Sequence, residues 1–335
     1  MTTSKKSLLV LVVVLGVCLL ALIRQKPPVP SAEHSLKQTP PEAGSRSRDH
    51  GGPEPGSVDV PNAADSGPLD SDDSTAQWSL LAGLLERPHQ RPKVAEVPLL
   101  TAENEARLIE LYRSIPSAWN KQHIIRILAF GGCSPSAQVL LETLTREYAG
   151  VEITLGDAAV LDFVPVLSGI LARRNDDALA LLVQGSNPEF WVNTVMWKRD
   201  SSSSAREAAV LTGKCIQGLC VSERPEGRKI FEFYRDHPEQ TVFVHPNGEV
   251  HCFSGGVIDA AFMKAIVSEV GLEEMMDQIV YDPDILLRRF SDWRHGTAGG
   301  RSWDAWDSQA RAFQRQLKER AAGRAVTGSV LKIDI

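Results

Sequence analysis

The sequence lacks the short patterns that identify the common catalytic and cofactor-binding sites. It contains no nucleophile elbow, no His-Glu-x-x-His helix, no phosphate loop and no dinucleotide loop. Cys-x-x-Cys pairs of the kind that bind zinc are also missing. We therefore expect no cofactor and assign no catalytic residue, although an enzyme without a recognisable motif stays open as a class.

An excess of positive charge is missing as well. The 335 residues include 36 Lys and Arg against 42 Asp and Glu, which gives a formal net charge of -6. Proteins that bind nucleic acid usually neutralise phosphates with a basic face that survives in the overall charge balance. The composition thus argues against a nucleic-acid partner and favours a protein partner.

One long uncharged run lies near the N-terminus, at residues 7–23. Lys5 and Lys6 precede it, and Arg24 and Lys26 follow it. As a helix the run would span about 26 Å, enough for one pass when the flanking Lys and Arg side chains reach the interface. We expect residues 7–23 to be a transmembrane signal anchor in the cell membrane.

Two kinds of processing compete with a permanent anchor. A signal peptide needs a small-x-small cleavage site after the apolar run, where Arg-Gln-Lys-Pro-Pro stands instead. The stretch 15–18, Leu-Gly-Val-Cys, is similar to a bacterial lipobox, but Val17 is larger than the small residue wanted before the cysteine.

The orientation of the anchor follows from its short basic head, residues 1–6, for which the usual outcome is head inside and domain outside. The missing Asn-x-Ser/Thr acceptors and the Ala-, Arg- and Leu-rich composition favour a bacterial periplasmic location.

Residues 24–75 are expected to form a disordered tether. From Pro27 to Thr75 there are nine prolines and five glycines, and no aromatic residue occurs. Such a composition cannot bury enough apolar surface to form a core. A flexible chain of about 50 residues has a root-mean-square reach of about 40 Å, so the domain that follows could work well away from the bilayer.

Helical periodicity predicts a mainly α soluble domain over residues 76–293. The best-marked helix spans 101–115, where Thr101 can cap the N-terminus and Pro116 ends the apolar stripe. Capping residues before proline predict two more helix starts, at 134–135 and 187–188. Further helices are expected at 77–86, 139–148, 157–171, 177–183, 205–219, 228–234, 257–270 and 285–290. The short polar turns between them indicate antiparallel neighbours.

Successive helix pairs of about 35 to 50 residues, over residues 100–236, resemble HEAT-type or related α-solenoid repeats. That resemblance implies an antiparallel helical array with a protein-binding surface, and it supplies no catalytic residues. One pair cannot be aligned on another beyond its apolar spacing. An irregular helical bundle is therefore the alternative fold.

One β-hairpin is expected at 241–253, with Pro246-Asn247-Gly248 as its turn. If His245 pairs with Glu249, the valines at 242, 244 and 250 share one face with Cys252. A hairpin alone is marginal in water, so we expect this valine face to be buried against neighbouring helices.

The other hairpin face carries His245, Glu249 and His251. Imidazole and carboxylate groups are ordinary zinc ligands, and three protein groups suffice for a catalytic site. These residues are the candidate ligands for a divalent metal, the alternative being cross-strand polar pairs on an exposed face. The Ser254-Gly255-Gly256 stretch that follows resembles a turn.

Residues 294–335 are expected to hold a Gly-rich break and an amphipathic C-terminal helix. Its apolar stripe has spacings of three and four and includes Trp303, Trp306, Phe313 and Leu317. The stripe could dock on the domain as a terminal cap, bind a partner helix, or lie at a membrane surface. The cap is favoured because it needs no further molecule, and the four residues are the candidate partner-binding site.

Four cysteines fall in the soluble part: Cys133, Cys215, Cys220 and Cys252. An even number permits two disulfides, but cysteines in a domain of this size are core residues about as often. A core role is favoured for Cys215. Pairing of Cys220 or Cys133 with Cys252 would fit an oxidising compartment.

Three hypotheses for the function follow. The leading one is a membrane-tethered helical protein-interaction module, a scaffold or adaptor in a bacterial envelope complex. The second is a hydrolase with a metal or acid/base site near the hairpin 241–253, and the third is a structural spacer.

Overall fold

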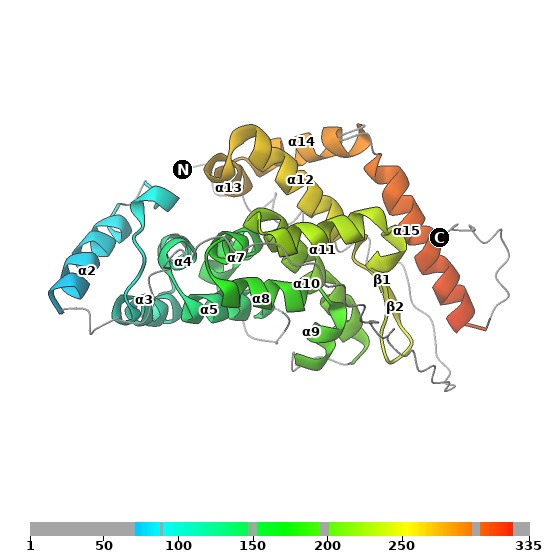
Figure 1. Cartoon of the computed structure of the whole chain (residues 1–335), viewed down its shortest axis with the longest axis horizontal. Coiled ribbons are helices and arrows are strands. Elements are labelled where there is room, and N and C mark those ends of the chain that lie inside the picture. The colour runs from blue at the N-terminus through cyan, green and yellow to red at the C-terminus, as the bar shows by residue number, and fades with distance from the viewer. Residues whose placement is uncertain are drawn as a thin grey trace, which may run out of the picture. The chain divides into compact units, whose positions relative to one another are not determined.

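The computed structural model describes residues 71–87, 90–146, 148, 153–194, 201–296 and 302–323, all within one compact unit, Ala64–Ile335. This part of the chain is mainly helical and has one small two-stranded sheet (Figure 1). The predicted anchor and the tether as far as residue 70 lie outside the described residues. Within the described ranges, no single helix is long and apolar enough to cross a membrane, although one bent pair of helices, joined at 58°, satisfies the same length and composition test.

The first helix corrects the end of the predicted tether 24–75. Helix α2 (Ser71–Leu85) begins five residues before that boundary. It is tied to the segment before the next helix, because the Gln77 amide donates to the Leu99 carbonyl at 2.8 Å and accepts from the Thr101 N–H at 2.9 Å. Serine and aspartate are favoured at the start of a helix, because they cap its free N–H groups and because negative charge interacts well with the helix dipole. A prediction of the tether from its proline and glycine content overlooks this signal.

Helix α3 (Ala102–Ser114) confirms the prediction for residues 101–115. The Thr101 hydroxyl accepts the N–H of Asn104 at 3.3 Å, and the helix ends before Pro116. The 3₁₀ turn η1 (Val94–Glu96) precedes it, and α4 (Ala118–Gly131) follows it.

A buried carboxylate caps helix α5 (Ser134–Thr145). Glu105 of α3 is 2% exposed and accepts the N–H groups of Cys133 at 2.6 Å and Ser136 at 3.0 Å. The Ser136 hydroxyl donates to the same oxygen at 2.5 Å. These bonds satisfy donors at the helix N-terminus that have no partner within the helix.

The single helix predicted at 157–171 is wrong, because the chain forms two. Helix α6 (Leu155–Leu161) and helix α7 (Val164–Ala172) are bent at 58° to each other. Pro165 lies in the first turn of α7, where its missing N–H costs no hydrogen bond, but it could not continue a helix from α6.

The remaining elements follow the predicted order with shifted ends. They are α8 (Asp176–Gly185), α9 (Pro188–Thr194), α10 (Ser201–Ser222), α11 (Pro225–Asp236), η2 (Pro238–Thr241), β1 (Val242–Val244), β2 (Val250–Cys252), α12 (Ser254–Val270), α13 (Leu272–Tyr281), α14 (Pro283–His295) and α15 (Trp303–Ala321). Helix α13 has no counterpart among the predicted helices. The stretch Ser254-Gly255-Gly256, interpreted as a turn, is the first turn of α12.

The helices from α3 to α12 contact one another in two successions. Helices α3, α5, α8 and α11 touch in that order, and α4, α7, α10 and α12 do the same, with contacts between the two sets. Figure 1 shows α3, α5 and α8 following one another. Helix α7 is buried along its whole length and lies at the centre of this core.

Helix α13 reaches back to the start of the domain. The Asp277 carboxylate pairs with Arg91 and lies 3.6 Å from the guanidinium of Arg126 on α4, and Glu273 accepts the Val94 N–H at 3.0 Å. Burial lowers the pKa of Arg126 to about 10, while the Asp277 charge opposes that shift. The α13–α14 segment is therefore anchored at one end by charges on residues far away in the sequence.

The hairpin has the predicted register, but the prediction of its buried face is wrong. Val244 pairs with Val250, and the His245 N–H donates to the Glu249 carbonyl at 2.8 Å. Val250 is 3% exposed, yet Val244 is 52% exposed. On β1 the buried side chain is Phe243 of the other face, which is 9% exposed, and α15 contacts both strands while α10 contacts β2.

Candidate functional site

A cleft of about 580 Å³ opens beside the two parallel helices α10 and α12. Volumes between about 300 and 1,000 Å³, with mostly apolar walls and a few polar groups, are typical of binding sites. The walls also include residues of α13, α14, α15, β2 and the α6–α7 turn. The apolar lining side chains include Met263, Ile266, Met275, Ile279, Leu286, Leu287 and Phe290.

Helix periodicity explains how α10 and α12 face the cleft. On α12 the lining residues begin at Gly255 and Gly256 and recur at 259, 262, 263 and 266, which is one stripe of a helix. Gly256 lets α12 approach α10 closely, because a Cβ atom there would lie 2.2 Å from the Gly213 Cα. The two glycines thus set the spacing of the helices at one end of the cleft.

An aromatic cluster holds the far side of the cleft in place. Phe262 of α12 has its ring centroid 5.0 Å from that of Phe290 and 5.4 Å from that of Trp293. Trp293 in turn stacks on Trp303 of α15 with a centroid distance of 5.5 Å. None of the residues of α14 is fully buried, so this helix forms a wall with one side open to solvent.

Asp259 is the acidic group inside the apolar part of the cleft. Its side chain is half-buried and accepts a hydrogen bond from the Gln217 amide at 3.3 Å. Burial among apolar groups raises the pKa of the Asp259 carboxyl to about 6, while the positive charge of Arg294 opposes the rise. A carboxyl with a pKa so far above its ordinary value, inside a cleft, marks a candidate functional residue.

The hairpin end of the cleft is basic. Arg206 of α10, His251 of β2 and Arg311 of α15 line it. Burial lowers the pKa of His251, the Glu249 carboxylate opposes that shift, and the charges of Lys318 and Arg206 add to it. His251 is therefore neutral near pH 7, and the fixed positive charges at this end come from the arginines.

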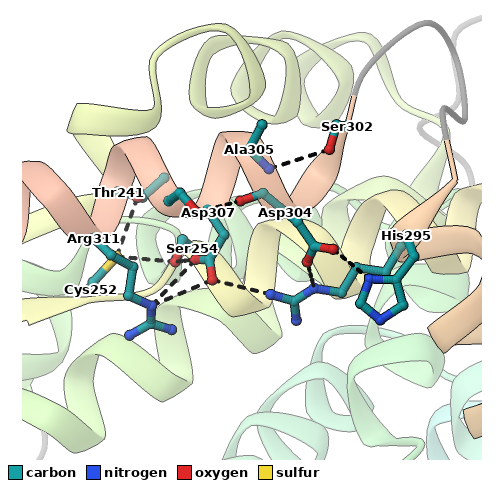
Figure 2. A network of polar contacts seen from close by, with 11 residues as sticks. Thr241, Cys252, Ser254, His295, Ser302, Asp304, Ala305, Asp307 and Arg311 are labelled. Atoms are coloured by element: carbon teal, nitrogen blue, oxygen red, sulfur yellow. Dashed lines mark hydrogen bonds and ion pairs between the residues drawn. The ribbon is translucent and has the colours of Figure 1, made fainter.

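Figure 2 shows a network of polar contacts that includes the lining residues Cys252 and Arg311. The Cys252 thiol donates to the Ser254 hydroxyl at 3.1 Å, and Ser254 donates to the Asp307 carboxylate at 2.5 Å. Arg294 bridges Asp307, at 3.2 Å, and Asp304, at 2.7 Å. The network joins α12, α14 and α15 through Ser254, Arg294 and Asp307.

The structure brings only two of the three candidate metal ligands together. The His251 Nε2 lies 3.4 Å from a Glu249 carboxylate oxygen. His245 is 8% exposed, and its Nδ1 accepts the N–H of Asn247 at 3.2 Å within the turn. In the described part of the chain, no group of three His, Cys, Asp or Glu side chains could hold a metal ion.

The C-terminal helix packs on its own domain, which agrees with the favoured cap. Trp303 and Trp306 are 5% and 3% exposed, and the Trp306 indole donates to the Arg235 carbonyl at 2.7 Å. The assignment of these two residues to a partner-binding site is therefore corrected, because their surfaces are covered within the chain. Phe313 and Leu317 are half-buried.

The four cysteines that follow the predicted anchor and tether are free thiols in the structure. Cys215 is fully buried, as its proposed core role requires, and burial raises the pKa of its thiol. Burial also raises the pKa of Cys220 to about 12. Neither thiol is poised for chemistry, because the thiolate is the reactive form.

Sequence reasoning missed Asp259 and the cleft around it. The available signal was Asp259 itself, a charged residue on the apolar stripe of the helix predicted at 257–270. Gly213 and Gly256 within helices were a second signal, since glycine inside a helix points to close packing.

Comparison of the sequence with protein-family models gave no match, and searches of curated proteins and of solved structures gave no significant match either.

Proposed function

We propose that this chain is a membrane-tethered helical interaction module, a scaffold or adaptor, whose cleft beside α10 and α12 receives a protein partner. The observation that carries the proposal is the cleft itself, with its apolar lining and the exposed apolar side chains at its edge. Val210 and Leu287 line the cleft and are 40% and 50% exposed. Apolar surface that continues from a cleft to its rim is typical of a protein-docking surface.

The order of helix contacts supports the HEAT-like part of the proposal. Along one set of helices, Asp176 at the start of α8 pairs with Arg224, the residue before α11. Ser186, after the end of α8, accepts from Tyr234 near the end of α11, so the two helices run in the same direction. Both pairs join residues 48 positions apart. Lys121 and Asp157, paired at 2.6 Å between α4 and α6, are 36 apart. The separations of 48 and 36 residues lie on either side of the repeat length of HEAT-type helix pairs, about 40 to 47 residues. The support therefore comes from the order and direction of the helices and not from a fixed repeat length.

The anchor and tether supply the rest of the proposal. A domain on a tether with a reach of about 40 Å can meet a partner that is not itself at the bilayer surface. In a bacterium the domain would lie in the periplasm. Free thiols at Cys215 and Cys220 are compatible with that setting, because both are enclosed in the core.

The experiment is partner capture after brief cross-linking in cells, with the full-length chain and two variants. Met263→Arg puts a charged side chain in the cleft, at a half-buried position from which it can reach solvent. Leu155→Arg is the matched control, because Leu155 is 87% exposed at the start of α6 and does not line the cleft. The proposal expects one stoichiometric partner with the natural chain and the control, and at least a tenfold loss with Met263→Arg. Equal recovery with all three chains, or no partner with any, contradicts it.

A further inference from the structure

The cleft is better suited to a polypeptide segment than to a compact small molecule. Its edge on α14 includes Leu287, which is 50% exposed. On the opposite side Val210 of α10 extends the apolar surface outward. A small molecule enclosed in the cleft would leave these side chains in water, whereas a helix laid along the cleft would cover them.

The carboxylate of Asp259 accepts only a weak hydrogen bond among the described side chains. The hydrogen bond from Gln217 is long, at 3.3 Å, and comes from a neutral amide. The cation that acts on Asp259 is Arg294, whose guanidinium already bonds to Asp304 and Asp307. An occupant that covered Asp259 with apolar groups alone would remove more water from a carboxylate, which is costly.

The charged groups around the cleft differ from one end to the other. The charged and titratable side chains on the elements that face Asp259 are Arg206 and Lys214 of α10, Asp162 after α6, His251 of β2, Arg294 of α14 and Arg311 of α15. From α13 the lining residues are the uncharged Met275 and Ile279. Positive charges at the hairpin end repel a cation, so the favourable places for one are the two carboxylates of the lining. Asp162 is exposed, whereas Asp259 is the half-buried carboxylate on the apolar stripe of α12 that a bound helix would cover.

We propose that the occupant of the cleft is an amphipathic helical segment of the partner that carries a lysine or arginine within its apolar face, and that this cation pairs with Asp259. The inference rests on the proposed function and adds the chemistry and the orientation of the partner. The basic residue lies at Asp259, and any acidic residue of the segment points toward Arg206 and Arg311.

Synthetic peptides test the inference directly. The probes are three labelled helical peptides with the same leucine stripe and a central lysine, glutamine or glutamate. Fluorescence anisotropy measures their binding to the full-length chain in lipid nanodiscs, so that no detergent competes for the cleft. We expect the lysine peptide to bind about tenfold more tightly than the glutamine peptide near pH 7, and the glutamate peptide to bind most weakly.

Two variants separate the charge of Asp259 from its shape. Asp259→Asn should remove the preference for lysine while leaving the affinity for the glutamine peptide within about twofold. Asp292→Asn is the matched control, because Asp292 is an exposed carboxylate of α14 that does not line the cleft, and it should keep the preference. The lysine peptide should also bind the natural chain about tenfold more tightly near pH 8 than near pH 5, since binding stabilises the ionised carboxyl.

The outcomes distinguish this inference from the proposed function. Equal binding of lysine and glutamine peptides, a preference for glutamate, or a lysine preference that survives in Asp259→Asn overturns the inference even if Met263→Arg still abolishes partner capture. If no peptide binds and Met263→Arg captures the partner normally, both the inference and the cleft-docking proposal fail.

Discussion

Replacing Asp259 with asparagine should stabilise the folded chain above pH 6. The carboxyl lies among apolar side chains of the cleft, and its pKa rises from 3.8 in the unfolded chain to about 6 in the fold. Between about pH 4 and pH 6, the folded state holds a proton on Asp259 that the unfolded state has released. The free energy of unfolding therefore falls as the pH rises from about 4 to about 6. Asparagine has nearly the same shape and carries no charge, so it avoids this loss.

The size of the effect follows from the shift. Each pKa unit corresponds to about 1.4 kcal/mol, so a change from 3.8 to about 6 gives about 3 kcal/mol. This is an upper bound, because the side chain keeps partial contact with solvent and the protein can relax around the charge. The hydrogen bond from Gln217 can persist, since the asparagine amide oxygen also accepts.

The assay is urea unfolding of the full-length chain followed by tryptophan fluorescence, at a series of pH values. The free energy of unfolding of Asp259→Asn should exceed that of the natural chain by between about 1 and 3 kcal/mol near pH 8, and the difference should vanish below about pH 4. A difference that does not change with pH, or a variant less stable near pH 8, refutes the reasoning.

Three further predictions concern packing. Glu105→Ala should lower the free energy of unfolding by about 2 to 4 kcal/mol, because it leaves buried donors at the start of α5 unpaired. The control Glu110→Ala, at an exposed position of α3, should cost under about 0.5 kcal/mol. Equal losses in urea unfolding would contradict the capping role of Glu105. Gly256→Ala should lower the free energy of unfolding by about 1 to 3 kcal/mol, because its Cβ would clash with the Gly213 backbone. Gly255→Ala should be nearly neutral, because its Cβ would meet nothing within 4 Å. A lower melting temperature for Gly255→Ala than for Gly256→Ala would contradict the close approach of α10 and α12. Truncation before Gly296 should lower the melting temperature by several degrees, since it removes two buried tryptophans, and an unchanged melting curve would show that α15 does not support the domain.

Local signals predicted most of the elements. Thr101 and Pro116 marked both ends of α3 because capping and proline geometry act within one turn of the chain. The turn at 246–248 fixed the hairpin register for the same reason, and His245 does pair with Glu249. These features need no knowledge of distant residues.

Features set by distant contacts were missed. Which face of the hairpin is buried depends on α15, which lies more than 50 residues further along the chain and holds β2 through the Gln314 bond to the Val250 carbonyl. The exposed Val244 is the consequence. In contrast, helix α13 was missed although its sequence carries local signals, because Glu273 and Glu274 lie in its first turn and Met275, Met276, Ile279 and Val280 follow at helical spacing.

The candidate site was hidden for a related reason. Asp259 reads as one charge on an amphipathic helix until α14 is placed beside α12, and only then is it enclosed. In contrast, the tryptophan stripe at 303 and 306 was visible in the sequence, but whether it covered its own domain or a partner was decided by packing.

Site-specific photo-cross-linking tests the cleft as the docking site most directly. A photoreactive amino acid replaces Leu287, at the edge of the cleft, or Leu80 of α2, and both positions are 50% exposed. In living cells, the account predicts one discrete cross-linked product from position 287 that disappears when Met263→Arg is added, and no such product from position 80. Products of equal yield at both positions, or a product at 287 that Met263→Arg leaves unchanged, would contradict it.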